Sequence, residues 1–485
     1  MSKDFVFPTG RPEEQGMASG NIRAFLEAAE ENGLEVHSFK LLRHGKAVAE
    51  GCWDPYSTED RHSLYSLSKS FTSTAVGFAV SEGLFSLDDR VVSFFPEYAP
   101  EKTDENLSAM RVRHLISMAT GHAEDTTDRI RKDRDGNWVR GFLSLPVEYE
   151  PGTHFLYNTG ATYMLSAIIR KLTGQSLLDY LMPRLFEPLG IERPVWENCP
   201  MGTNVGGWGL SLKLDDIARF GQLYLQKGKW LGKQLLPDGW ADEATSFKVP
   251  NGEEPKSDWC QGYGYQFWRC RHNAYRGDGA FGQFCVVMPE QDAVFAFLSG
   301  FEDMQRLLDL CWEHLLLPMS VSALPENEKD YAALQSKLAA LAYPPLRGQR
   351  SSKLESGFSG RRFKLESNDL RYDEIRFAFD DQFNTLYLKT SGVEQAIRLG
   401  KGEWLTGGYE YVLKTEFVDM QLGTKVVASA AWEDDSTLRI LLRHIETPFC
   451  QRLVCRFEKD GLRLQAGFNV SFGTAVFSDI AGRAV

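Results

Sequence analysis

The segment YSLSKSFTSTAVGFAV (residues 65–80) places a serine, Ser66, and a lysine, Lys69, three positions apart at the start of an apolar run. The run predicts a buried helix, because Phe71, Val76 and further apolar residues follow at helical spacing. A lysine in such a segment is costly to desolvate unless it is paired, neutralised or put to use. We therefore expect Lys69 to have a chemical role.

Ser66 and Lys69 are suited to share a proton. At positions i and i+3 of a helix, two side chains lie one turn apart on the same face. A serine hydroxyl becomes an effective nucleophile when a base takes its proton, and a lysine can be that base once its pKa falls toward neutrality. The first turn of a helix also offers unpaired N–H groups to a developing oxyanion. The alternative, an N-cap serine beside a solvated lysine, conflicts with the apolar surroundings.

The longer segment YSLSKSFTSTAVGFAVSEGLFSLDDRVVSFFPE (65–97) resembles the serine β-lactamase and penicillin-binding protein family, in its class C and esterase branch. Members open their central helix with Ser-x-x-Lys and continue with Gly-Leu/Lys-x-x-Leu-x-Asp-x-Val and Pro-Glu. The resemblance extends over residues 12–320 and implies an α/β (α+β) β-lactamase/transpeptidase-like catalytic domain. It also implies a metal-independent serine hydrolase that forms an acyl-enzyme on Ser66 and needs no cofactor.

The second motif of the family, Tyr-x-Asn after a Pro-Gly-Thr turn, corresponds to PGTHFLYNTG (151–160). This correspondence assigns Tyr157 to the base system beside Lys69, where a tyrosine acts as a phenolate stabilised by an ammonium or as a proton relay. The asparagine is displaced by one position, since Asn158 follows the tyrosine directly and Thr159 takes the third place. Thr159 is thus the expected substrate-binding residue, with a hydroxyl instead of an amide.

The third motif, Lys-Thr-Gly or His-x-Gly on an edge strand, aligns with three residues of YRGDGAFGQFCVVMP (275–289): Gly277, Asp278 and Gly279. The resemblance implies an oxyanion hole made by the backbone amides of Ser66 and Ala280, with Asp278 and Gly279 in the substrate site. Because glycine replaces the cation that attracts substrate carboxylates in the family, we expect an ester or neutral amide rather than a β-lactam. Arg276 is expected on the strand face opposite Gly277.

The letters GDGAFG (277–282) also form a Gly-x-Gly-x-x-Gly pattern. A dinucleotide-binding loop ends a strand and opens a helix, whereas QFCVVMP and AVFAFLSG, which follow, have the pattern of two strands. We therefore expect no nucleotide cofactor. No HExxH, Walker A or Gly-x-Ser-x-Gly motif occurs, and the nine histidines have no ligand spacing, so neither a metal site nor an α/β-hydrolase fold is predicted.

The stretch YPPLRGQRSSK (343–353) has the composition of a linker. Period-two segments after it, such as TLYLK (385–389) and STLRILLRH (436–444), predict antiparallel strands. We therefore expect a serine hydrolase domain over residues 1–345 and an all-β domain, barrel or sandwich, over residues 346–485.

The overall composition limits the partners. A net charge of −12 offers no basic surface for nucleic acid, and no apolar run is long enough to span a membrane. The N-terminal residues have no signal-peptide pattern, and eight cysteines occur without a CxxC pair, which favours a cytoplasmic protein with reduced thiols. We expect the partner to be a small ester, amide or short peptide.

Two other interpretations stay open from the sequence. The first is β-lactamase, D-amino-peptidase or penicillin-binding activity, which the family also includes. The second is a catalytically weak relative that binds a peptide or cell-wall fragment and uses the β domain for partner contact. The altered second and third motifs are the observation that motivates this second alternative.

Overall fold

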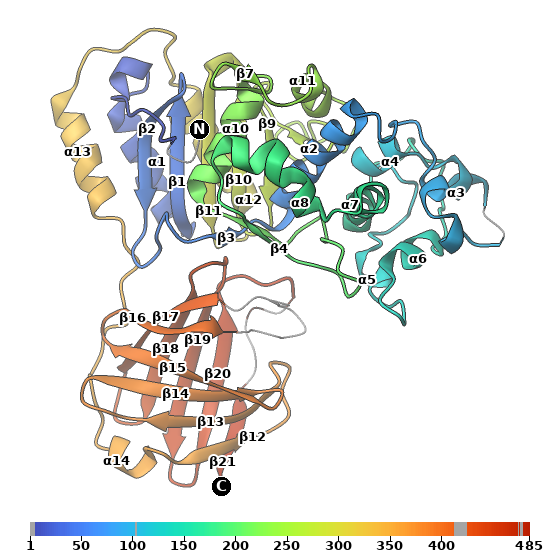
Figure 1. Cartoon of the computed structure of the whole chain (residues 1–485). Helices are drawn as coiled ribbons and strands as arrows, with labels where there is room; N and C mark the ends of the chain where they lie inside the picture. The colour runs from blue at the N-terminus through green and yellow to red at the C-terminus, as the bar shows by residue number, and fades with distance from the viewer. Residues whose placement is uncertain (1–4, 102–103, 412–423, 474, 476–478) are drawn as a thin grey trace.

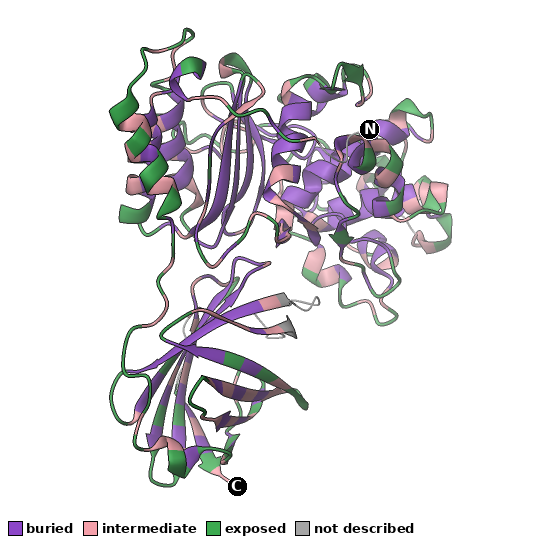
Figure 2. Ribbon diagram, turned by 60° about the vertical axis from the view of Figure 1, so that its left-hand side comes forward, coloured by how far each residue is buried: buried purple, intermediate pink, exposed green. Residues whose placement is uncertain are grey.

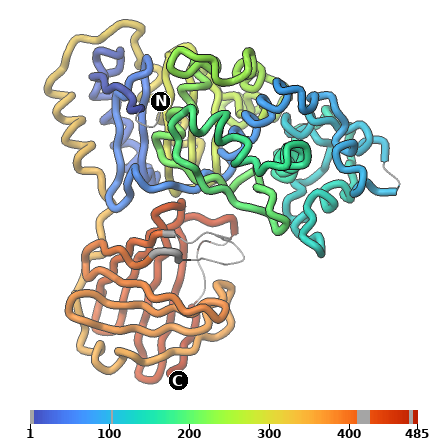
Figure 3. The backbone as a smooth tube through the Cα atoms, viewed as in Figure 1, coloured from blue at the N-terminus to red at the C-terminus, as the bar shows by residue number. Residues whose placement is uncertain are grey.

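The computed structural model describes residues 5–101, 104–411, 424–473, 475 and 479–485. The N-terminal part of the chain is an α/β part, and the C-terminal part is an all-β part that lies below it in Figures 1 and 3. None of the described helices is long and apolar enough to cross a bilayer.

A six-stranded antiparallel sheet forms the centre of the α/β part, in the order β2-β1-β11-β10-β9-β8. Its strands are β1 (Val36–Arg43), β2 (Lys46–Cys52), β8 (Trp268–Arg269), β9 (Tyr275–Gly279), β10 (Gln283–Met288) and β11 (Ala293–Ser299). Every residue of β1, β10 and β11 is buried, and Figure 2 shows these strands as the continuous buried centre. The apolar runs of these strands therefore have packed neighbours on both faces.

Helices cover both faces of this sheet. One face carries α1 (Ser19–Glu31), α12 (Met304–Leu310) and α13 (Glu328–Ala339), and Phe25 of α1 packs on Phe297 of β11 at 5.9 Å. The other face carries α10 (Leu214–Leu225) and the helical layer that contains α2 (Ser68–Ser81). The remaining helices of the α/β part are α3 (Glu105–Ala109), α4 (Val112–Ile116), α5 (Thr127–Ile130), α6 (Trp138–Leu143), α7 (Thr159–Thr173), α8 (Leu177–Leu181), α9 (Glu187–Leu189) and α11 (Trp240–Thr245). Short strands β3 (His62–Ser63), β4 (Val195–Trp196), β5 (Leu210–Leu212), β6 (Lys229–Trp230) and β7 (Lys233–Gln234) complete it.

The predicted apolar helix is α2, and it is buried on all sides from Ser68 to Ala79. Small side chains permit this position, since a Cβ on Gly77 would lie 2.5 Å from the ring of Trp240. The hydroxyl of Thr72 donates to Gly206 O at 2.8 Å, so this polar group of the helix keeps a partner in the interior. The buried helix α2 therefore fixes the position of the residues in its first turn, which include Lys69.

The all-β part is a barrel and not a sandwich. Its strands are β12 (Arg362–Leu365), β13 (Tyr372–Ala378), β14 (Phe383–Thr390), β15 (Val393–Lys401), β16 (Leu405–Tyr411), β17 (Thr424–Trp432), β18 (Thr437–His444), β19 (Cys450–Glu458), β20 (Gly461–Phe468) and β21 (Ile480–Ala484), with α14 (Glu355–Phe358) before them. The sheet closes because β15 pairs in parallel with β17 at Gly400↔Ser429. Alternate residues such as Leu386 and Leu388 fill the interior.

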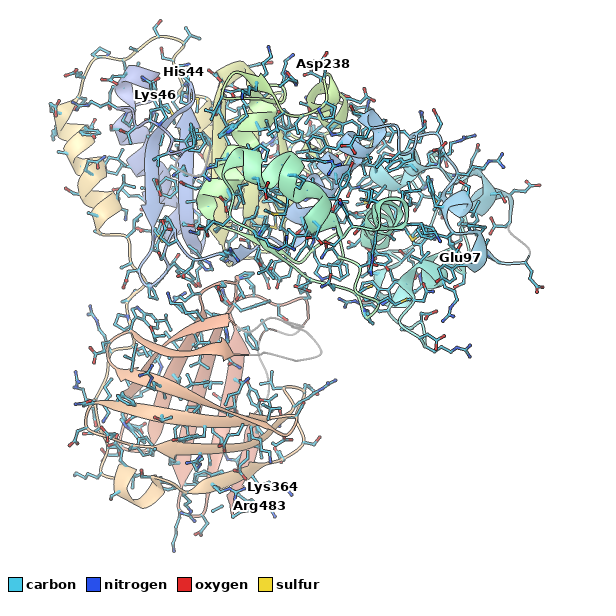
Figure 4. The ribbon with its side chains drawn as sticks, viewed as in Figure 1. His44, Lys46, Glu97, Asp238, Lys364 and Arg483 are labelled. Atoms are coloured by element: carbon cyan, nitrogen blue, oxygen red, sulfur yellow. The ribbon has the colours of Figure 1, made fainter. Side chains whose placement is uncertain are left out.

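The two parts meet through polar contacts at one end of the barrel. Arg443 of β18 pairs with Glu35, and Lys425 Nζ lies 3.1 Å from Asp60 Oδ2. At the opposite end, Lys364 and Arg483 face each other across β12 and β21, far from the α/β part in Figure 4. The predicted division between residues 345 and 346 stays a prediction, and β12 begins at Arg362.

Candidate active site

Ser66 lies in a 3-10 turn, η2 (Tyr65–Leu67), immediately before α2. The preceding residue, Tyr65, has a φ of 46°, a left-handed conformation that is rare for a bulky side chain. Lys69 lies in the first turn of α2 and is 1% exposed, and its Nζ donates to Ser66 Oγ at 3.0 Å. The structure thus brings the serine and the lysine together across one turn, with the serine itself partly exposed.

Lys69 is held in an environment that favours its neutral form. Its Nζ also donates to Gly207 O at 2.8 Å, a carbonyl from a distant loop. Burial lowers the pKa of Lys69 from 10.5 to about 7, although the nearby carboxylates Asp125 and Asp278 act in the opposite direction. Near neutral pH a large share of this amine therefore has a free lone pair.

Tyr157 lies beside this pair. Its ring centroid is 4.7 Å from Lys69 Nζ, and the ring stacks on Trp268 at 5.2 Å. Burial raises the pKa of Tyr157 well above its ordinary value and the charge of Asp278 adds to this, whereas a hydrogen bond with Ser66 acts against it. The phenol consequently keeps its proton, which suits a relay better than a phenolate base.

The displaced motif residues have different positions. Asn158 is fully buried, and its Oδ1 accepts from Thr126 Oγ1 at 2.7 Å while its Nδ2 donates to Thr120 Oγ1 at 3.3 Å. Thr159 is partly exposed and begins α7, and its amide donates to Asp125 Oδ2 at 2.8 Å. The asparagine is therefore part of the interior, and Thr159 is the residue that remains accessible.

Strand β9 presses closely on the serine turn. A Cβ on Gly279 would lie 1.9 Å from Leu64 O and 3.1 Å from Ser66 N, and a Cβ on Gly277 would lie 2.5 Å from Ser70 Oγ. The two glycines therefore permit a backbone approach that no other residue allows. This approach brings the backbone leading into Ala280 beside the amide of Ser66.

Asp278 and Arg276 form a buried ion pair on the other face of β9. Arg276 Nε lies 2.7 Å from Asp278 Oδ2, and the two side chains are 0% and 6% exposed. The guanidinium also stacks over Trp259 at 4.2 Å and donates to Asp258 O. Arg276 lies on the face opposite Gly277, as the alternation of the strand predicts, and its charge is already paired with Asp278.

Several contributors to the site were not predicted from the sequence. The Gly207 carbonyl and the carboxylate of Asp125 are the clearest, and the Gly206-Gly207 pair was the available signal for a close backbone approach.

Aromatic residues form a wall beside Tyr157: Phe155, Trp259, Tyr263 and Trp268. His122 is not part of the site, because it is buried and contacts Thr120 Oγ1 at 2.9 Å.

As the sequence pattern predicts, a strand and not a helix follows GDGAFG. β9 turns directly into β10, and the two are antiparallel, with Gly279 opposite Gln283. Among the described residues there is no group of histidine, cysteine, aspartate and glutamate side chains that would hold a metal ion. All eight cysteines are free thiols.

Comparisons with known proteins agree with this architecture. The chain is 26% identical over 295 residues to the 6-aminohexanoate-dimer hydrolase of Paenarthrobacter ureafaciens, covering 55% of this chain and 73% of that protein. It is 25% identical over 200 residues to the lovastatin esterase of Penicillium rubens, covering 35% of this chain and 50% of that esterase. A crystal structure of SurE with D-Leu, 18% identical with a TM-score of 0.50, covers 88% of this chain and 98% of that chain, and so resembles both parts in fold.

Hydrolysis of ester or amide bonds by a serine enzyme is the activity that these relatives support. The Beta-lactamase family profile matches residues 20–310, which include the Ser66 turn, the Tyr157 loop and β9. The resemblance seen in the sequence is thus confirmed, and the chain belongs to the beta-lactamase family.

Proposed function

We propose that this protein is a metal-independent serine hydrolase that acylates Ser66 with a small ester or neutral amide and then hydrolyses the acyl-enzyme. The observation that carries the proposal is the contact of 3.0 Å between Lys69 Nζ and Ser66 Oγ, with the lysine buried and its pKa about 7. A neutral amine at this distance is a general base already in place.

In the acylation step, the neutral Lys69 amine takes the proton of Ser66 Oγ as the oxygen attacks the substrate carbonyl carbon. The carbonyl oxygen becomes an oxyanion, which the amides of Ser66 and Ala280 stabilise. The bond to the leaving group then breaks, and the proton passes from Lys69 through the phenol of Tyr157 to the leaving oxygen or nitrogen. A water molecule repeats the sequence on the acyl-enzyme, with Lys69 again as the base, and releases the acid product.

The charges on β9 support a substrate without a free carboxylate. Gly277 offers no cation, and the nearby guanidinium of Arg276 is already paired with Asp278. A substrate carboxylate placed here would therefore find no unpaired cation on β9. Of the three residues predicted for the substrate site, Thr159 and Gly279 offer a hydroxyl and a backbone group that suit uncharged ester or amide atoms. Asp278, the third, is proposed to border the substrate while paired with Arg276.

The test is Ser66→Ala with p-nitrophenyl esters as substrates. We expect kcat to fall by about 10⁴–10⁶-fold with unchanged thermal unfolding, because the nucleophile is lost and the fold is not. Ser73→Ala is the matched control, since Ser73 is buried on the same helix and its hydroxyl has no hydrogen-bond partner. Near-normal turnover by Ser66→Ala would exclude the proposal.

Three further assays separate the alternatives. A fluorophosphonate should label the wild-type protein at Ser66, whereas ligand binding without labelling would favour a catalytically weak binding protein. Nitrocefin and D-amino-acid amides should be turned over far more slowly than the esters, and the reverse order would favour the β-lactamase or D-amino-peptidase alternative. Incubation with EDTA should leave esterase activity unchanged.

A further inference from the structure

Four aromatic rings join the barrel to the α/β part beside the serine turn: Tyr65, Phe281, Phe449 and Phe472. The ring of Phe449 lies 6.4 Å from that of Tyr65 and 5.8 Å from that of Phe281. The ring of Phe472 lies 5.6 Å from Tyr65 and 4.7 Å from Phe281. Tyr65 and Phe281 are themselves in edge contact at 5.9 Å, so the four rings form one aromatic cluster.

The two α/β members of this cluster flank the proposed oxyanion hole. Tyr65 directly precedes Ser66, and Phe281 directly follows Ala280. Ala280 and Tyr65 also pack against the apolar core of the barrel, and Phe281 belongs to that core. The aromatic cluster therefore touches the backbone next to each of the two amide donors.

Both flanking residues have a strained backbone. The φ angles of Tyr65 and Phe281 are 46° and 67°, in the left-handed region that bulky side chains rarely adopt. Such conformations persist only where surrounding contacts over-determine them. For both residues the barrel supplies such contacts, through Phe449 and Phe472.

Hydrogen bonds from the barrel support the same two segments, one directly at Ser63 and the other through Gly300 and Phe301. Ser63 N, before the serine turn, donates to Glu446 O at 2.8 Å. Asn469 Nδ2 donates to Gly300 O at 2.9 Å, and the next residue, Phe301, donates its amide to Phe281 O at 3.2 Å. The two segments that carry the amides of Ser66 and Ala280 are thus both hydrogen-bonded, directly or through Gly300 and Phe301, to the barrel.

We propose that the barrel is a positioning element for catalysis, in which Phe449 and Phe472 hold Tyr65 and Phe281 and thereby fix the amides of Ser66 and Ala280. This inference rests on the proposed function, because it assigns a task to the same two amides. Without the two phenylalanines, the strained residues relax and the two N–H groups no longer converge on one oxygen. Transition-state stabilisation then falls, whereas ground-state binding of substrate does not.

The first test is Phe472→Ala in the full-length protein. Phe472 is 62% exposed, so the substitution leaves the folded core intact. We expect kcat for a p-nitrophenyl ester to fall by about 10-fold or more, with KM within twofold of wild type. Phenylboronic acid, whose tetrahedral adduct with Ser66 Oγ places an oxygen in the hole, should lose affinity by a similar factor. Phe472→Tyr keeps the ring and should restore both quantities.

A second variant and a control complete the design. Phe449→Leu keeps an apolar side chain in the barrel core and should lower kcat further when combined with Phe472→Ala. Val393→Ala is the control, because Val393 has the same exposed fraction of 62% and lies at the start of β15. This control should behave as wild type in every assay.

The inference is overturned if the double variant retains kcat and boronate affinity within twofold of wild type. It is also overturned if KM rises while kcat stays constant, because the ring would then contact substrate and not position the amides. Failure of the proposed function is a separate result, since it requires that Ser66→Ala remain active.

Discussion

Lys69 combines a central position in the mechanism with an unfavourable position for a charge. It is 1% exposed, and its hydrogen-bond partners are one hydroxyl and one carbonyl. Burial of this kind disfavours the ammonium and so produces the base that Ser66 needs. From this burial we predict how the reaction rate depends on pH and, separately, how the stability of the protein depends on pH.

The rate should depend on pH through Lys69. With a pKa of about 7, the amine is protonated in acid and cannot accept the proton of Ser66. We expect kcat/KM for a p-nitrophenyl ester to rise about tenfold per pH unit below this value and to level off above it. A profile that stays flat between pH 5 and pH 8 would show that another group is the base.

Burial of Lys69 should also lower the stability of the folded protein, and this loss should depend on pH. The pKa of Lys69 is lower in the folded protein than in an unfolded chain, so the unfolded chain binds more protons between pH 7 and pH 10.5. The destabilisation is therefore complete below pH 7 and disappears as the pH rises through that window. Lys69→Met should raise Tm at pH 6 by about 2–4 °C or more, and by less at pH 10, while abolishing activity. Lys329→Met, on the exposed face of α13, should change neither quantity.

The sequence predicts local pairs of residues better than distant ones. Ser66 and Lys69 are separated by three positions, so helical geometry alone brings them together. The position of the Asn158 side chain could not be predicted in this way, because its amide is hydrogen-bonded to Thr126 and Thr120, more than thirty residues earlier. For the Gly207 carbonyl, which accepts from Lys69 across 138 residues, the Gly206-Gly207 pair indicates a close backbone approach but does not indicate Lys69 as the partner.

At the scale of elements, the distance between β9 and the serine turn is the critical quantity. The alternation of residues predicts the strand and places Arg276 opposite Gly277. It does not predict that the strand lies close enough to exclude any Cβ at Gly277 and Gly279, because this distance is set by packing against α2. Nor does it predict that Asp278 pairs with the arginine two residues before it.

Gly279→Ala tests this close approach. The added methyl group would meet Leu64 O and Ser66 N, so β9 must move away from the serine turn. We expect kcat to fall by about 10²–10³-fold, the loss expected when one oxyanion donor is displaced. Gly357→Ala is the control, because nothing lies within 4 Å of its Cβ position, and it should leave kcat unchanged. Equal activity in the two variants would show that β9 does not supply a donor.

At the scale of the whole molecule, buried histidines lie where the two parts meet. His37 Nδ1 lies 3.2 Å from His62 Nε2, and the His37 ring stacks on Tyr56 at 3.8 Å. Arg443 of the barrel donates to Tyr56 Oη at 3.1 Å and pairs with Glu35. The sequence predicts two parts with different strand patterns, but it does not decide between a barrel and a sandwich, because closure depends on the pairing of Gly400 with Ser429.

Acid should therefore loosen this junction. Burial lowers the pKa of His62 from 6.5 to about 3 and also lowers that of His37, so the unfolded chain binds more protons below pH 6.5. Stability is complete above that pH and is lost as the pH falls toward 3. We expect Tm to decrease between pH 6.5 and pH 4.5, and His62→Gln should make the decrease smaller. His44→Asn should leave the slope as in wild type, because His44 lies exposed on the outer surface in Figure 4.

The central sheet joins strands that are far apart in the chain, and this has a consequence for biosynthesis. β1 (Val36–Arg43) pairs with β11 (Ala293–Ser299), which leaves the ribosome roughly 250 residues later. At roughly 5–20 residues per second, one edge of the apolar β1–β2 hairpin waits about 10–50 s for its partner. During this interval the nascent chain exposes the unpaired N–H and C=O groups of β1, which can pair with other chains. The yield of folded protein in cells should therefore depend on chaperones and on translation speed.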